Sequence, residues 1–335
     1  MTSKHLFSRV CRWRPVQPLP GLLLLAALLG ASAQAETLPL PTPDVDIVGE
    51  IRTTTSRHED TLVDIARRHG LGYEEIVQAN PGVDPWLPGE GTAIMLPTQY
   101  ILPDAPRDGI VINVPEMRLY YYPKLRKGEE PRVITYPIGV GRMDWATPLG
   151  TTKIVGKLEK PSWYPPESIR KEHAEKGDIL PRVVPPGPDN PLGEYSLRLD
   201  IPGYLIHGTN RAYGIGMRVT HGCMRLYPEN IEALFKAVPV GTPVHIIDQP
   251  FKSGWHDGVL YLEAHPPLEE SAAPNDLTPS VRAILAVQHK GNAEIDWDKA
   301  MDVAVEQRGI PVPISVMPQN QTAPSNPRPV VQGRF

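Results

Sequence analysis

The chain has 335 residues, long enough for two domains. Its 34 basic and 38 acidic side chains give a formal net charge of -4, which argues against a protein that binds nucleic acid through a basic face. Proline occurs 40 times, well above the usual share of about 5%, and this excludes a helical bundle and favours short strands, turns and exposed connections. Two cysteines are too few for a disulfide scaffold.

Residues 1–35 have the layout of a secretory signal peptide. Four basic residues precede an apolar stretch at 19–29, and small residues up to Ala33 and Ala35 offer cleavage sites. The apolar stretch is shorter than the roughly 20 residues of a membrane-spanning helix; an uncleaved anchor is the alternative. We predict cleavage after Ala35, or else after Ala33, giving an exported chain without stable membrane insertion. Cleavage removes four basic and no acidic residues, so the net charge becomes -8, and it leaves Cys223 as the only thiol.

A small unit is predicted after the cleavage site. Residues 36–50 hold three prolines and predict an extended lead-in. In the unit at 51–98, β-branched residues predict a strand at 51–55. Apolar spacing predicts a helix that is capped by Asp60 or Thr61 and ends at Gly70, and a second helix at 73–79. A strand at 93–96 completes a β-α-α-β order.

After a short linker at 103–106, the region 107–250 is mainly β. Strands are predicted at 110–114, 117–122, 132–140, 151–158, 195–199, 204–207 and 243–247, the first two forming a hairpin at Pro115-Glu116. Residues 161–194 interrupt the series with eight prolines and a helical patch at 167–176, which predicts an insertion near one end of the sheet. Pro228 begins a helix with one apolar face.

The C-terminal part is predicted to be partly helical. Residues 251–310 form an extension with helices that begin at Thr278 and Asp296. Six prolines fall within 311–335, and we predict that this tail is flexible.

The residues capable of chemistry are concentrated between 204 and 225. Cys223 is preceded by His207 sixteen positions earlier and by His221 two positions earlier. A neighbouring histidine activates a thiol as a nucleophile, and the residues alone do not decide which histidine does so. Three other interpretations are an inert buried cysteine, an intermolecular disulfide, and a zinc site formed by the same three side chains.

The segment EDTLVDIARRHGLGYEEIVQANPGVDPWLPGEGTAIMLP resembles the LysM module. It carries that module's D-T-L-x-x-I-A helix, N-P turn, L-P-G and closing I-x-L-P strand. The resemblance implies binding of N-acetylglucosamine-containing glycans, notably peptidoglycan. A purely structural packing role is the alternative.

The pattern His207-Gly208, a spacer, and then Thr220-His221-Gly222-Cys223 resembles the L,D-transpeptidases of the YkuD type. This implies a mainly β, sandwich-like catalytic domain that needs no metal or cofactor. By the same resemblance Cys223 is the nucleophile and His207 the base, and the Gly208 carbonyl orients the imidazole. His221 and Gly222 belong to the oxyanion hole or orient the site. The residues expected to bind substrate are Arg225, Thr220, Asn210 and Tyr213.

The order of LysM module, catalytic domain and C-terminal extension is similar to periplasmic enzymes that attach a lipoprotein to peptidoglycan. The resemblance implies acyl transfer from a tetrapeptide stem, with release of D-Ala, to the terminal Lys of an outer-membrane lipoprotein. The alternatives are 3-3 cross-linking of stems, hydrolysis of the same thioester, and a non-catalytic wall-binding protein. The paired His207 and Cys223 argue against the last of these.

Overall fold

A computed structural model describes residues 35–40, 46–271 and 276–316. The predicted signal peptide lies outside the described residues, apart from Ala35, and so does the tail beyond residue 316. Within the described ranges, no helix has the length and apolarity needed to cross a membrane.

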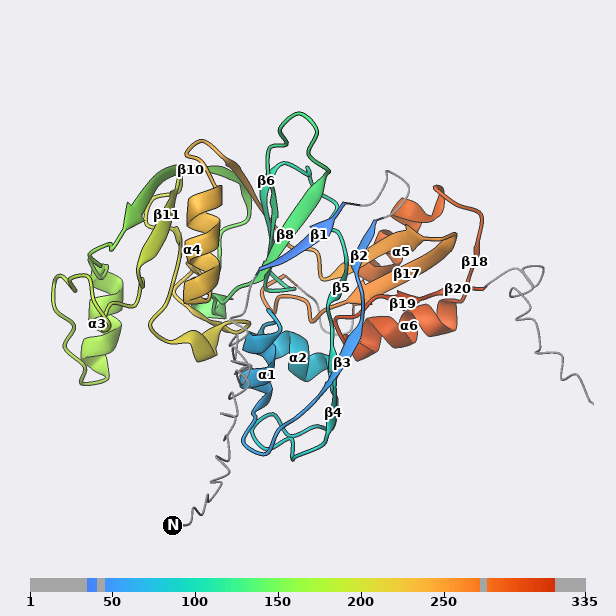
Figure 1. Ribbon diagram of the computed structural model, residues 1–335, viewed down its shortest axis with the longest axis horizontal. Helices are drawn as coiled ribbons and strands as arrows, with labels where there is room; N and C mark the ends of the chain where they lie inside the picture. Colours follow the sequence, from blue (N-terminus) through green and yellow to red (C-terminus); the bar gives the residue numbers. More distant parts are fainter. Residues whose placement is uncertain (1–34, 41–45, 272–275, 317–335) are drawn as a thin grey trace, which may run out of the picture. The chain divides into compact units, whose positions relative to one another are not determined.

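The largest sheet has nine strands, of which Figure 1 labels β1, β6, β8, β10 and β11. It contains the strand that ends at His207 and the strand that follows Cys223. β6 and β15 are parallel, as are β12 and β14, and the other neighbours are antiparallel. A bulge between Ile154 and Gly156 lets the long β10 pair first with β15 and then with β11. The strand order is β1 (Glu36–Pro39), β8 (Arg132–Pro137), β7 (Arg118–Tyr122), β6 (Gly109–Asn113), β15 (Pro243–Ile247), β10 (Gly150–Glu159), β11 (Tyr195–Leu199), β12 (Leu205–His207) and β14 (Met224–Arg225).

The hairpin of β6 and β7 is buried on both faces, and its alternating side chains contribute to two apolar clusters. Leu119 and Tyr121 pack into the main core, whereas Tyr120 and Tyr122 face a second apolar cluster that includes Tyr100. Because side chains alternate along a strand, one short hairpin supplies both clusters. Helix α4 (Pro228–Ala237), which begins at the predicted Pro228, packs against β11 and closes the main core with Ile231 and Leu234.

The N-terminal unit has the predicted β-α-α-β order. It consists of β3 (Arg52–Thr55), α1 (Leu62–Arg68), α2 (Tyr73–Ala79) and β4 (Ala93–Leu96), with β3 antiparallel to β4. Thr61 and Asp64 form a capping box at α1, which decides between the two predicted caps. The unit has its own apolar core around Leu62 and Ile76.

The described parts of the lead-in, residues 36–40 and 46–50, contain strands. β1 adds to the edge of the large sheet, and β2 (Ile47–Gly49) pairs with β5 (Gln99–Ile101). Proline cannot donate a ladder hydrogen bond, but an edge strand does not require every donor. Composition therefore predicted an extended chain here without revealing its partners.

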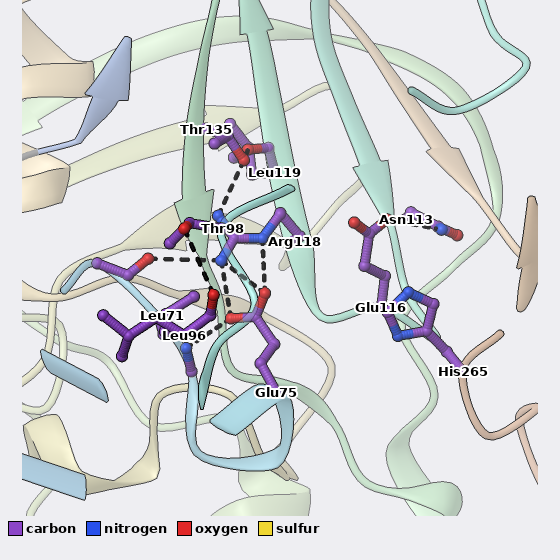
Figure 2. Close-up of polar contacts among 12 residues, drawn as sticks. Leu71, Glu75, Leu96, Thr98, Asn113, Glu116, Arg118, Leu119, Thr135 and His265 are labelled. Atoms are coloured by element: carbon purple, nitrogen blue, oxygen red, sulfur yellow. Dashed lines mark hydrogen bonds and ion pairs between the residues drawn. The ribbon is translucent and has the colours of Figure 1, made fainter. Parts of the chain in front are cut away.

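A buried ion pair joins the N-terminal unit to the large sheet. The side chain of Arg118 on β7 is 0% exposed, and its Nε and Nη2 donate to the two carboxylate oxygens of Glu75 on α2 at 2.7 and 2.8 Å. Figure 2 shows the guanidinium facing this carboxylate, with Thr135 accepting a further bond at 3.0 Å. The guanidinium also lies over the ring of Tyr100, 4.3 Å from its centroid. The N-terminal unit thus supplies the carboxylate that neutralises the buried guanidinium, while Thr135 is supplied by the neighbouring strand of the sheet.

We expect Arg118→Met to lower the free energy of unfolding by about 3–5 kcal/mol, because it leaves the Glu75 carboxylate buried without its cation. The matched control is Arg52→Met, which removes an exposed pair with Glu50 and should cost about 0–1 kcal/mol. Urea titration of both variants measures the difference. Equal losses in the two variants would contradict the proposed importance of this contact.

The prediction for the C-terminal extension ends too early, at residue 310, and it omits the strands of this region. The extension contains a β hairpin, β16 (Phe251–His256) and β17 (Val259–Ala264), besides α5 (Thr278–Gln288) and α6 (Trp297–Glu306). Asp257 and Gly258, both at positive φ, form the hairpin's two-residue turn. Asp-Gly is a strong hairpin signal that the sequence analysis did not use.

Residues 311–316 are not part of a flexible tail. β19 (Val312–Pro313) pairs with β17, and β20 (Ser315–Val316) pairs with β18 (Glu294–Ile295). Ile314 between them is fully buried in the extension's core. Pro313 is tolerated because β19 is an edge strand. The ordered extension therefore runs to residue 316 within the part of the chain that the structure describes.

Candidate active site

The sheet pairs the strand that ends at His207 with the strand that begins directly after Cys223. In the parallel pair of β12 and β14, Ile206 lies opposite Met224 and His207 opposite Arg225. Ile206 and Met224 are both 0% exposed and belong to the main core. Since side chains alternate, His207 and Arg225 project from the opposite face, and the Cys223 thiol, next to β14, is bonded by the backbone N–H of Leu205, two positions before His207. The sequence left two histidines as possible partners of the thiol, and the register favours His207.

The imidazole of His207 is held in one tautomer. The side chain is buried, and its Nδ1 lies 2.6 Å from the carbonyl oxygen of Gly208. Because a carbonyl only accepts, Nδ1 carries the hydrogen and Nε2 is left with a free lone pair. Burial lowers the pKa of His207 to about 3, and the nearby charge of Arg225 acts in the same direction. His207 is therefore a neutral imidazole at physiological pH.

Cys223 is a half-buried free thiol. Its Sγ lies 3.7 Å from the carbonyl oxygen of Gly203, to which it donates. Burial raises the pKa of the thiol, while the backbone N–H of Leu205 and the charge of Arg225 act against this rise. The resting pair is accordingly a neutral thiol and a neutral imidazole, so a proton has to move when the sulfur attacks.

The turn before Cys223 is shaped by close packing. Gly222 has φ +94°, and a Cβ there would lie 2.7 Å from the Tyr204 ring, so the position requires glycine. Thr147 donates to the carbonyl of Gly222 at 3.1 Å, and Thr220 donates to that of Cys223 at 2.6 Å. Both carbonyls are thus fixed, and among the described residues the N–H groups of 221–223 have no hydrogen-bond partner.

The side chain of His221 is hydrogen-bonded to the insertion. Its Nε2 lies 3.0 Å from a carboxylate oxygen of Glu172 on α3 (Glu167–Glu175), and its ring meets Trp145 edge-on at 5.1 Å between centroids. Burial lowers the pKa of His221, and the hydrogen bond to Glu172 opposes that shift. These contacts favour a role for His221 in orienting the site over a role as the base.

The four residues expected to bind substrate differ in placement. Thr220 is buried and its hydroxyl is used inside the turn, which fits a structural part better than substrate contact. Asn210 donates to the carbonyl of Pro188 in the insertion at 3.2 Å. Tyr213 is 61% exposed on the 3-10 turn η2 (Ala212–Gly214). Arg225 is largely enclosed, its Nε has no partner among the described residues, and burial lowers its pKa.

The ligands of the alternative zinc site do not converge. Within the described residues, the carboxylate and histidine groups close enough to share a metal ion are Glu116, Glu263 and His265 instead. The ammonium of Lys252 already bridges the two glutamates at 2.9 and 2.8 Å. Lys252 therefore supplies the positive charge that a metal ion would bring to this cluster.

Glu172, Arg142 and Trp145 also contact the motif and were not predicted from the sequence. Arg142 donates from Nη2 to Glu172 at 2.7 Å, and its backbone N–H donates to the carbonyl of Thr220 at 3.1 Å. Trp145 closes the 3-10 turn η1 (Met143–Trp145) beside the motif. Nothing in the charged sequence of α3 distinguishes Glu172 from the other solvated residues there.

Known proteins resemble this chain over most of its length. The YkuD family, described as the L,D-transpeptidase catalytic domain, matches residues 107–246. The probable L,D-transpeptidase ErfK/SrfK of Escherichia coli K12 is 42% identical over 88% of this chain and 96% of its own length. The chain belongs to the L,D-transpeptidase family. This L,D-transpeptidase is also 42% identical to the probable L,D-transpeptidase YbiS of the same organism, over 84% of this chain and 93% of that protein.

Solved structures match the enzyme over a smaller part. L,D-transpeptidase 3 from Mycobacterium tuberculosis aligns with 47% of this chain and 67% of its own, with 18% identity and a TM-score of 0.31.

Proposed function

We propose that this L,D-transpeptidase works through a thioester on Cys223. The sulfur attacks the carbonyl of diaminopimelate, the third residue of a peptidoglycan tetrapeptide stem, and D-Ala leaves. An acceptor amine then attacks the thioester, forms an amide with the same carbonyl, and releases the thiol. The observation that supports the proposal is that His207, fixed through Nδ1, lies opposite Arg225, two positions after Cys223, in the parallel pair of strands.

His207 moves the protons in this scheme. Its free Nε2 takes the thiol proton as sulfur attacks and passes it to the nitrogen of departing D-Ala. In the second half it takes a proton from the acceptor amine and returns it to sulfur. The Gly208 carbonyl holds the ring as a side-chain carboxylate does in many triads.

The turn at 221–223 supplies the remaining chemistry. Its unpartnered N–H groups support an oxyanion hole, where losing one donor costs about 10²–10³-fold in related acyl-transfer chemistry. Arg225 lies in register beside His207, and its planar guanidinium suits a carboxylate of the stem.

The same proposal places the enzyme in the periplasm, with a signal peptide cleaved after Ala35 or Ala33. In this proposal the β-α-α-β unit binds glycan, as a LysM module does. The supporting feature is an aromatic pair, the exposed Trp86 and the half-buried Tyr73, stacked at 6.0 Å between ring centroids. A bound glycan raises the local concentration of the stem donor.

For the acceptor, we propose the terminal Lys of an outer-membrane lipoprotein. The similarity to lipoprotein-attaching enzymes extends to the N-terminal unit, the insertion and the extension together. The net charge of -8 after cleavage also favours a cationic Lys over an anionic stem, through weak and screened forces.

We expect the wild-type enzyme, expressed in a strain that lacks its own L,D-transpeptidases, to produce lipoprotein-bound muropeptides. The sacculi are digested and scored by mass spectrometry for bound lipoprotein, for diaminopimelate–diaminopimelate dimers and for shortened stems. Cys223→Ala is the matched control and should give none of the three.

The products separate the possible acceptors. Abundant 3-3 dimers without bound lipoprotein would mean that the acceptor is a second stem and not the lipoprotein. Tripeptide stems without either linkage would mean that water resolves the thioester. Each of these outcomes contradicts the proposed acceptor while leaving the Cys223 chemistry in place.

A further inference from the structure

A carboxylate of the insertion connects two cations and an imidazole beside the motif. Glu172 on α3 meets Arg142 and Lys176 at 2.7 Å each and His221 at 3.0 Å. Its side chain is 19% exposed, as expected for a group that its partners enclose. Glu172 belongs to a segment that the family motif does not include, yet it reaches a residue two positions from the thiol.

The contacts of Glu172 restrict His221 more than packing alone does. Nε2 of His221 donates to the carboxylate, which leaves Nδ1 without the proton in the neutral ring. Trp145 meets the ring on another side. A carboxylate that selects one tautomer and an aromatic edge that limits rotation together fix one orientation of the ring beside the turn at 221–223.

Glu172 also joins the two walls of a cleft. An open cavity of about 550 Å³ lies between α3 and the segment around η1, and its lining includes Arg142, Trp145 and Glu172. The Arg142–Glu172 bond bridges these walls, and the backbone of Arg142 is bonded to Thr220 of the motif. Movement of α3 would therefore be transmitted to the motif.

We propose that Glu172 is a positioning residue of the L,D-transpeptidase reaction. It acts through His221 and Arg142 by fixing the imidazole and holding the insertion against the motif, and it does not itself touch the thiol. The inference rests on the proposed Cys223 chemistry.

A double-mutant cycle with D-Ala release as the readout tests this inference. Glu172→Ala should lower kcat/KM about tenfold, the middle of the range for residues in direct contact. In a His221→Ala background the same substitution should have a much smaller effect, because the group that it positions is gone. Glu172→Gln keeps the size of the side chain and should lose part of the rate. Thermal unfolding of each variant checks that the fold is retained.

Glu175→Ala is the matched control. Glu175 lies on the same helix and lines the same cleft, but its carboxylate has no partner among the described residues. It should retain wild-type kcat/KM. Equal rates for the Glu172 and Glu175 variants, or an undiminished Glu172 effect without His221, would overturn the positioning inference.

Failure of the wider proposal is distinguishable. If the wild-type enzyme and Glu175→Ala release no D-Ala, the thioester mechanism fails and this inference fails with it. If both are active and Glu172→Ala is equally active, only the positioning part is lost.

Discussion

Cys223→Ala is expected to reduce D-Ala release from a tetrapeptide donor by about 10⁶-fold, as in other acyl-transfer enzymes that lose their nucleophile. Beyond the predicted cleavage site the chain contains no second thiol that could substitute. The fold should survive because the side chain is small, half-buried and bonded only weakly to Gly203. The measurement is coupled detection of free D-Ala, with circular dichroism as the check on the fold.

Cys223→Ser is the companion variant. It retains a hydroxyl of similar shape in the same turn, but a hydroxyl is a far weaker nucleophile than a thiolate. We therefore expect it to fold normally and to remain almost inactive. Substantial D-Ala release by Cys223→Ala would rule out the thiol as the reacting group.

His207→Ala is expected to lower kcat about 10²–10⁴-fold, the usual range for loss of a general base. His221→Ala should cost much less, because that ring is bonded to Glu172 and not to the reacting pair. D-Ala release under saturating donor measures both. A larger loss at His221 than at His207 would reverse the two assignments.

The pH profile gives a second readout for His207. Its pKa is lowered to about 3 by burial, so the base is still unprotonated in mildly acidic solution. Activity should therefore persist as pH falls from 7 to 5 and decline only as the pH approaches the lowered pKa. An acid limb of kcat/KM near pH 6.5, the ordinary value for histidine, would contradict the buried neutral imidazole.

The β-α-α-β unit and most strands of the large sheet could be predicted from local pattern. Helix α2 and strands β4, β11 and β15 have the predicted limits, because their apolar spacing and their flanking Pro or Gly residues are local properties. The strands of the lead-in and of residues 311–316 could not be predicted in this way. Their pairing depends on distant partners such as β8 and β17, and short Pro-containing segments carry little periodicity.

In the candidate active site, too, some residues could be predicted from local pattern and others depend on distant packing. Spacing left two histidines as possible partners of Cys223, the resemblance predicted His207, and the parallel register of β12 and β14 favours the same choice. Glu172 lies far from Cys223 in the sequence and belongs to no local pattern; its proposed importance depends on where the insertion packs. Thr220 was expected to bind substrate, but its hydroxyl is directed into the turn.

The central claim is that the stem is transferred through Cys223, and intact-mass spectrometry of the enzyme with a tetrapeptide donor and no acceptor tests it most directly. We predict one adduct with the mass of the donor minus D-Ala, located on the peptide that contains Cys223 and absent from Cys223→Ala. Adding an amine acceptor should discharge it. D-Ala release without an adduct on this peptide, or an adduct that persists in Cys223→Ala, would contradict the account.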